Sequence, residues 1–141
     1  MLLKGDGEQA ESNDMPADEK ESMPDQYVKV SLENFIKYSK DMFAYWTEND
    51  FAASFRKMLT LEQFRNEEMQ ALYQQYLVAG PAGYVKDLFV GMGMKDADNK
   101  ADMFYSVMFF YYSLYDGAEE KGQIKDRFEN VIDDIALKLN N

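Results

Sequence analysis

The ionisable and nucleophilic side chains set the first limit on what this chain can do. Its 141 residues include no cysteine and no histidine. Thiolate nucleophiles, the commonest general base and the commonest metal ligand are therefore missing. Acidic pairs such as Glu67 with Glu68 and Asp133 with Asp134 are sequence neighbours, which do not face each other on a helix. We expect a solvated surface there, and no enzymatic activity, catalytic residue, cofactor or metal.

Two short motifs resemble ligand-binding loops but lack essential parts. Gly91-Met92-Gly93 has no third glycine and no preceding strand, so it predicts the end of a helix rather than a phosphate loop. Asp96-Ala97-Asp98 has calcium-loop spacing, but Ala101 and Val107 stand where that loop needs glycine and glutamate. We expect a turn there, with Asp98 as the cap of the next helix.

The abundance of aromatic residues and methionine is the feature that favours a small-molecule ligand. Ten Met, ten Phe and ten Tyr form a bulky, adaptable set that suits irregular apolar pockets. The simpler alternative is that they fill the core. Buried tyrosine hydroxyls need a partner, which a ligand, a water or a neighbouring side chain can supply. Inward register and polar groups beside apolar bulk select these pocket candidates: Met42, Trp46, Met69, Tyr73, Phe89, Phe104, Met108 and Tyr111.

The charge of the chain argues against contact with nucleic acid or anionic lipid. Acidic residues outnumber basic ones 26 to 15, the net charge is −11, and no basic cluster interrupts the pattern. No secretory signal is visible, and no apolar run approaches the about 20 residues that span a bilayer. Absence of cysteine fits a reducing compartment. We expect a cytoplasmic protein that binds neither membrane nor DNA directly.

The first 26 residues differ from the rest. They carry eight acidic residues and two lysines, they lack aromatics before Tyr27, and Pro16 and Pro24 interrupt any helical pattern. Such a segment cannot bury enough apolar surface to offset the entropy of ordering. We expect residues 1–26 to be a flexible acidic segment or linker, with an acidic interaction arm as the alternative. Residues 27–141 then form one helical ligand-binding and dimerisation domain.

Apolar side chains recur at three- and four-residue intervals from Ser31 onward, and no strand-like alternation is present. Ser31 is the expected cap of the first helix, and a bend or restart is expected near Thr60. Gly80-Pro81 should end one helix, because proline cannot continue a helix but can begin one. The predicted fold class is all-α, a helical bundle whose last helices cover about 99–116 and 122–139.

The segment 99–116 is apolar around more than half of its circumference, whereas an outer helix of a bundle needs only one stripe. Its narrow remaining side carries Asp102, Ser106, Phe109 and Ser113. Phe109 would be exposed in a monomer, and the small serines would let a partner helix approach closely. We therefore predict a homodimer formed through the last two helices, with interface residues Ser106, Phe109, Ser113, Phe128 and Ile135.

Three stretches resemble the C-terminal effector-binding and dimerisation domain of TetR/AcrR-family transcriptional regulators. They are DFAASFRKMLTLEQFRN at 50–66, EMQALYQQYLVAGP at 68–81 and SLYDG at 113–117, and the similarity extends over about residues 32–140. The resemblance implies a bundle whose last two long helices pair with their mates in a four-helix interface. It also implies a pocket for an apolar or amphipathic effector.

In such regulators the effector controls DNA binding by an N-terminal helix-turn-helix domain. Residues 1–26 show no three-helix pattern and no basic recognition helix, so we expect either a fragment or a truncated relative. The resulting hypothesis is the ligand-sensing and dimerisation domain of a TetR-like repressor. One alternative is a helical interaction protein with a filled core and no ligand. Another is an enzyme using buried tyrosines and carboxylates, which the polar placement of nearly all acids disfavours.

Overall fold

The computed structural model describes residues 25–139. The chain divides into two units, residues 1–30 and residues 31–141. Within the first unit the described residues 25–30 are helical and begin the first labelled helix. The expected flexible acidic segment at 1–26 falls almost wholly outside the described residues.

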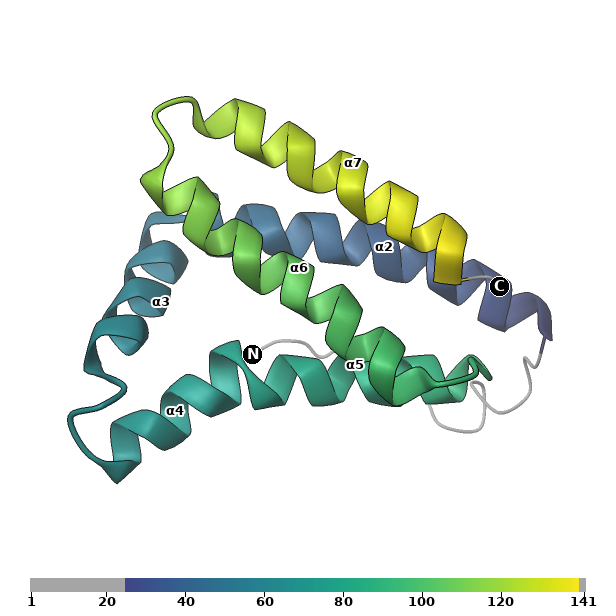
Figure 1. Ribbon diagram of the computed structural model, residues 1–141, viewed down its shortest axis with the longest axis horizontal. Coiled ribbons are helices and arrows are strands. Elements are labelled where there is room, and N and C mark those ends of the chain that lie inside the picture. The colour runs from purple at the N-terminus through teal and green to yellow at the C-terminus, as the bar shows by residue number, and fades with distance from the viewer. Residues whose placement is uncertain (1–24, 140–141) are drawn as a thin grey trace. The chain divides into compact units, whose positions relative to one another are not determined.

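The described residues form helices and no strand, which confirms the all-α fold class (Figure 1). In chain order the helices are α2 (Asp25–Glu48), α3 (Asp50–Glu62), α4 (Glu67–Leu77), α5 (Ala79–Gly91), α6 (Ala97–Gly117) and α7 (Lys121–Leu139). None of the helices in this part of the chain is long and apolar enough to cross a membrane.

Three expected helix boundaries are wrong. Ser31 lies inside α2, because no helix-breaking residue separates it from Pro24. α3 passes through Thr60 without a bend, and the Thr60 hydroxyl donates to the Arg56 carbonyl one turn earlier at 2.9 Å. α6 begins one residue after Asp96, so Asp98 is not its cap; Asp96 takes that position in the left-handed conformation, with φ 52°.

Asparagine side chains begin two of the helices. Asn49 accepts a hydrogen bond from the Ala52 amide at 2.9 Å, and Asn66 accepts one from the Met69 amide at 2.8 Å. Both residues have extended backbone, as N-caps require. These caps let the chain turn sharply between α2 and α3, and again between α3 and α4, without leaving helix-terminal amides unpartnered.

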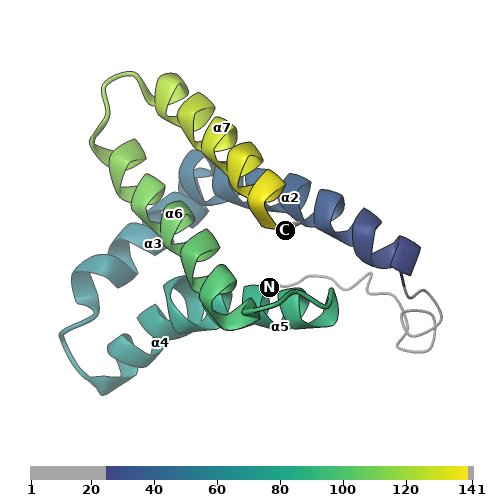
Figure 2. The same cartoon turned by 45° about the vertical axis from the view of Figure 1, so that its right-hand side comes forward.

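α6 is the helix on which the others pack. It contacts α5 and α7, while α4 contacts α5 and α3. Figures 1 and 2 show α6 running diagonally between α7 and α5. At the C-terminal end of α6, the Lys121 ammonium donates to the carbonyls of Tyr115, Asp116 and Ala118 at 2.8, 3.2 and 3.2 Å. A cation there satisfies terminal carbonyls and the negative end of the helix dipole.

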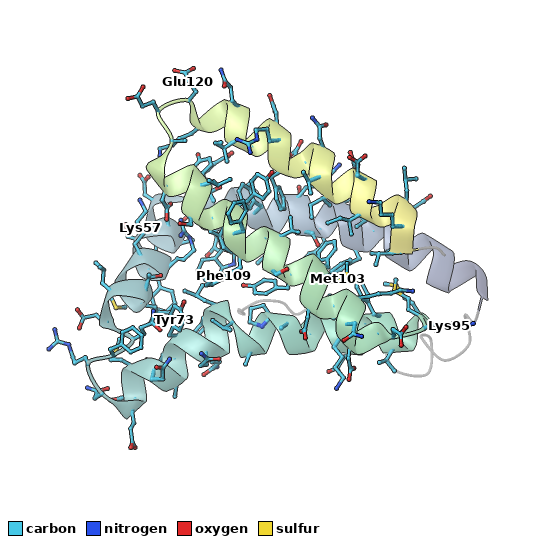
Figure 3. All side chains as sticks on the ribbon, in the orientation of Figure 1. Lys57, Tyr73, Lys95, Met103, Phe109 and Glu120 are labelled. Carbon is cyan, nitrogen blue, oxygen red and sulfur yellow. The ribbon has the colours of Figure 1, made fainter. Side chains whose placement is uncertain are left out.

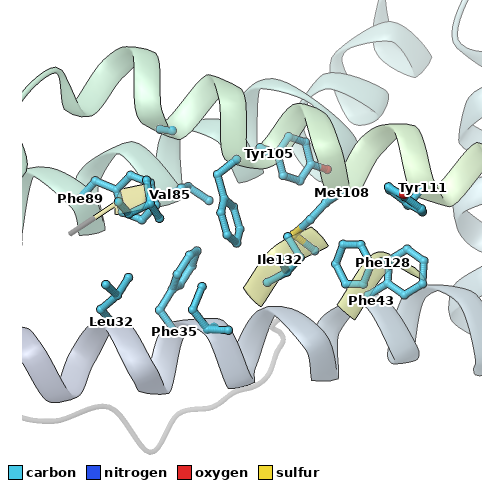
Figure 4. Packing of buried hydrophobic residues seen from close by; sticks show 14 of the residues in the cluster. Leu32, Phe35, Phe43, Val85, Phe89, Tyr105, Met108, Tyr111, Phe128 and Ile132 are labelled. Carbon is cyan, nitrogen blue, oxygen red and sulfur yellow. The ribbon is translucent and has the colours of Figure 1, made fainter. Parts of the chain in front are cut away.

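Side chains of α2, α5, α6 and α7 form the main core. Phe43 of α2 and Phe128 of α7 stack within this core with ring centroids 4.0 Å apart (Figure 4). Towards α5, Phe35, Phe89 and Phe104 contact one another with centroids 5.0 to 6.0 Å apart. A separate small core consists of Leu59, Tyr73 and Leu77, contributed by α3 and α4.

Candidate functional site

Arg56 is a buried cation on the inward stripe of α3, beside Ala52 and Leu59. Its Nε donates to the Trp46 carbonyl at 3.1 Å, and its two terminal nitrogens donate to the Asp116 carboxylate at 2.8 and 2.7 Å. A guanidinium this deep is stable only when it is paired and hydrogen-bonded. The planar, two-bond geometry with Asp116 meets that requirement and ties α3 to α6.

Asp116 needs this partner as much as Arg56 does. It lies one residue before the end of α6, where the helix dipole disfavours a negative side chain. Arg56 opposes that effect with a full positive charge at hydrogen-bonding distance. The pair therefore stabilises both the buried face of α3 and the last turn of α6.

Two tyrosines of α6, Tyr105 and Tyr112, lie near this ion pair, and Tyr73 of α4 lies within electrostatic range of Tyr105. The Arg56 guanidinium lies over the Tyr112 ring, 5.0 Å from its centroid. The Tyr105 hydroxyl crosses to α4 and donates to the Leu77 carbonyl at 2.5 Å. We name Arg56, Tyr73, Tyr105, Tyr112 and Asp116 the tyrosine–arginine cluster.

The hydroxyls of the cluster affect one another's ionisation. Burial raises the pKa of Tyr105 well above its ordinary value of 10.0, the nearby Tyr112 and Tyr73 hydroxyls raise it further, and Arg56 lowers it. Burial also raises the pKa of Tyr112, against a lowering by Arg56. All three tyrosines and Arg56 are therefore within electrostatic range of one site, and Tyr105 and Tyr112 remain protonated at neutral pH.

Two of these hydroxyls have no hydrogen-bond partner among the described residues. Tyr73 is 8% exposed and Tyr112 is 5% exposed, and neither hydroxyl is bonded to any of these residues. Leaving a buried donor unpartnered costs about 1–3 kcal/mol. In native proteins such groups are uncommon and need an explanation.

The eight predicted pocket residues divide between the two cores. Phe89, Phe104, Met108 and Tyr111 are buried in the main core, where aromatic neighbours contact them directly. Tyr73 belongs to the small core, and Met69 packs against it. Trp46 and Met42 of α2 are partly buried, and Trp46 packs on the main core. Only Tyr73 coincides with the tyrosine–arginine cluster, although the carbonyl of Trp46 binds Arg56.

The remaining members of the cluster were absent from the predicted pocket. Arg56 had a recognisable signal, since a charged residue stood on the apolar stripe with Ala52 and Leu59. No sequence signal marked Asp116, because its partner Arg56 is 60 positions away in the sequence.

The predicted interface residues have different surroundings. Ser106 and Ser113 are exposed, and Ile135 is partly buried. Phe128 is 0% exposed and contacts Phe43, so it belongs to the core of the single chain and presents no surface to a partner. The reason is that its stripe on α7 points towards α2 and α6. Phe109 is partly covered by Tyr105, with ring centroids 6.4 Å apart, and projects from α6 beside it (Figure 3).

The exposed apolar surface of α6 lies on the side opposite its buried stripe. Met103 is 67% exposed and Phe110 is 57% exposed. Ser106, Ser113 and Gly117 are exposed too and continue the same row at three- and four-residue intervals. We name Met103, Ser106, Phe110, Ser113 and Gly117 the outer face of α6. Heptad spacing is the signal that places Met103 and Phe110 on this face. Phe109 is exposed too, as the sequence predicted for a single chain.

The described residues contain no group of three or more acidic side chains placed to hold a metal ion. Comparison of the chain with family models, with curated proteins and with solved structures gives no match.

Proposed function

We propose that this chain is the ligand-sensing and dimerisation domain of a TetR-like transcriptional regulator. It would bind a small apolar or amphipathic effector, and a helix-turn-helix domain outside this sequence would contact DNA. The supporting observation is that α6 has two roles. Its inner face supplies Tyr105 and Tyr112 to the tyrosine–arginine cluster, and its outer face exposes Met103 and Phe110.

A helix with this arrangement can couple two sites. A ligand held against Tyr105 and Tyr112 would change how α6 packs on α3 and α4, and the same rigid helix would carry that change to the outer face. Two sites on opposite sides of one element thus bias a shared conformational equilibrium, which is the physical requirement for a sensor. The resemblance of residues 50–66, 68–81 and 113–117 to TetR-family effector domains implies the same pair of functions.

The occupant proposed for the outer face is a second copy of the chain. Large side chains at Met103 and Phe110 alternate with small ones at Ser106, Ser113 and Gly117. This pattern lets two antiparallel helices pack large residues against small ones at close range. The face carries no charge, so two copies meet without repulsion despite the acidic character of the whole chain.

Sedimentation velocity of the purified chain at micromolar concentration tests the dimer. We expect a dimer for the wild type and a folded monomer for Phe110→Glu, because a charge at the centre of the apolar row would be desolvated in the complex. Leu61→Glu is the matched control, since Leu61 is an equally apolar and highly exposed residue on α3. A monomeric wild type, or equal dissociation by both substitutions, would contradict the proposal.

The rival is a helical interaction protein that binds no small molecule, and the filled main core supports it. Phe43, Phe89, Phe104 and Phe128 are completely buried against one another and against their neighbours. A thermal-shift screen of apolar and amphipathic compounds separates the two. Ligand at about 100 times Kd should add about 2.7 kcal/mol of stability. A flat result from a folded dimer would favour the rival.

A further inference from the structure

We propose that Tyr73, Tyr112 and the unused guanidinium hydrogens of Arg56 form the polar end of a ligand site. The site would take a neutral, mainly apolar molecule that carries a hydrogen-bond-accepting oxygen, such as a ketone. This inference rests on the proposed sensing function and specifies the ligand class for it. It places the polar contacts where the main core, which includes Tyr112, meets the small core, which includes Tyr73.

The site has more hydrogen-bond donors than acceptors. A guanidinium has five N–H groups, and Arg56 uses three of them, on the Trp46 carbonyl and on the two Asp116 oxygens. The hydroxyls of Tyr73 and Tyr112 add two more buried donors that have no partner among the described residues. The Leu77 carbonyl already accepts from Tyr105. An acceptor oxygen from outside the chain would satisfy these donors.

The donors of the site lie near one another. Arg56 covers the Tyr112 ring, while Tyr105 is anchored to Leu77, one helical turn from Tyr73 on α4. The hydroxyls of Tyr73 and Tyr112 both act on that of Tyr105. The walls beside these groups are apolar, because Leu59 and Leu77 are buried in the small core. A few hydrogen-bond donors among mainly apolar side chains are typical of a binding site for an amphipathic molecule.

The charge of the site favours a neutral ligand. The Asp116 carboxylate neutralises Arg56 through two hydrogen bonds, and burial raises the pKa of Tyr105 and Tyr112, so both are uncharged at neutral pH. An anionic ligand would lose its hydration and meet no uncompensated cation, so its desolvation would not be offset. A cationic ligand would face N–H and O–H donors where it needs hydrogen-bond acceptors. A neutral acceptor avoids both costs.

Substitution of each tyrosine by phenylalanine tests the donors without any ligand. Tyr112→Phe and Tyr73→Phe remove hydroxyls that form no bond within the described fold, so the Tm should stay constant or rise. Tyr105→Phe is the matched control, because it removes a hydroxyl that bonds Leu77, and its Tm should fall by a few degrees. Equal losses of Tm in all three variants would overturn the inference.

Titration calorimetry with matched probes tests the ligand class. The probes are fluorene and anthracene, their ketones fluorenone and anthrone, and the corresponding ring carboxylates. We expect the ketones to bind most tightly. Tyr112→Phe and Tyr73→Phe should weaken ketone binding by about tenfold, which corresponds to one lost hydrogen bond of about 1.4 kcal/mol. Tyr105→Phe should leave ketone binding within about twofold of the wild type.

The outcomes separate this inference from the proposed function. If hydrocarbons and ketones bind equally well and no tyrosine variant changes either affinity, the chain is a sensor but the polar end lies elsewhere. If carboxylates bind more tightly than ketones, the charge argument is wrong. If no probe binds and the thermal-shift screen is flat, the sensing function itself fails.

Discussion

At the scale of single residues, Arg56 has the greatest influence on this structure. Its side chain donates a hydrogen bond to the Trp46 carbonyl near the end of α2 and forms an ion pair with Asp116 in the last turn of α6. It also lies over the face of the Tyr112 ring. Buried ion pairs add little net stability compared with apolar residues of similar volume, but removal of one partner leaves an uncompensated charge. Substitution of one partner should therefore lower the stability of the fold more than replacement of both partners.

Asp116→Asn tests this asymmetry. It should lower the free energy of unfolding by about 3 kcal/mol, since it leaves the Arg56 charge buried without its carboxylate. The measurement is urea denaturation followed by circular dichroism. Asp41→Asn provides the comparison, because the Asp41–Lys37 pair is exposed and such pairs contribute about 1 kcal/mol or less. Equal effects of the two substitutions would show that the buried pair has no special role.

At the scale of helices, apolar periodicity predicted the architecture well. The spacing of inward residues located six helical segments, including the long last two, because each helix must bury one stripe. The ends were less predictable. Thr60 bonds back within α3, and Ser31 sits in the interior of α2, so residues that often begin or bend helices occupy continuous helix here.

The candidate site was predictable only in part, for a different reason. Tyr73 was selected from its inward register, yet its grouping with Tyr112 and Arg56 depends on how α3, α4 and α6 meet. The positions of apolar residues within one helix do not predict how these three helices pack together. Phe128 shows the same limit, since its inward stripe fitted either a dimer interface or a monomer core, and it is fully buried in the core.

The junction between α4 and α5 depends on a glycine. A Cβ built at Gly80 would lie 1.9 Å from the Gln75 carbonyl oxygen, a backbone atom that cannot move aside alone. Gly80→Ala should therefore lower the free energy of unfolding by about 1–3 kcal/mol through overpacking. Gly83→Ala is the control in the same helix, because nothing lies within 4 Å of its Cβ position.

Gly83→Ala should instead raise stability by about 0.5–1 kcal/mol, since alanine loses less backbone entropy in a helix than glycine does. Both variants can be compared by urea denaturation. A Gly80→Ala variant as stable as Gly83→Ala would mean that the junction relaxes without cost.

At the scale of the whole molecule, α6 links the proposed ligand site to the proposed dimer surface. Thermodynamic reciprocity makes this link measurable: if a ligand changes dimer affinity by some factor, dimerisation changes ligand affinity by the same factor. Saturating fluorenone should shift the dimer dissociation constant by about fivefold or more, the lower end of typical coupling. Sedimentation equilibrium with and without the ketone provides the measurement.

The monomeric Phe110→Glu variant supplies the reciprocal value, and Leu61→Glu supplies its control. Fluorenone affinity for the monomer should differ from that for the dimer by the factor found in sedimentation. Equal affinities for both forms, combined with an unchanged dimer constant, would show that the two faces of α6 act independently.

The surroundings of Trp46 have an optical consequence. It is the single tryptophan of the chain, its carbonyl holds the Arg56 side chain, and its indole lies edge-on to Tyr45 and stacked on Phe55, with centroids 5.6 and 6.4 Å away. The tryptophan emission of the protein therefore reports on one place, the joint between α2 and α3. Any displacement of α3 would alter indole emission, so the chain contains its own unlabelled reporter of movement beside the tyrosine–arginine cluster.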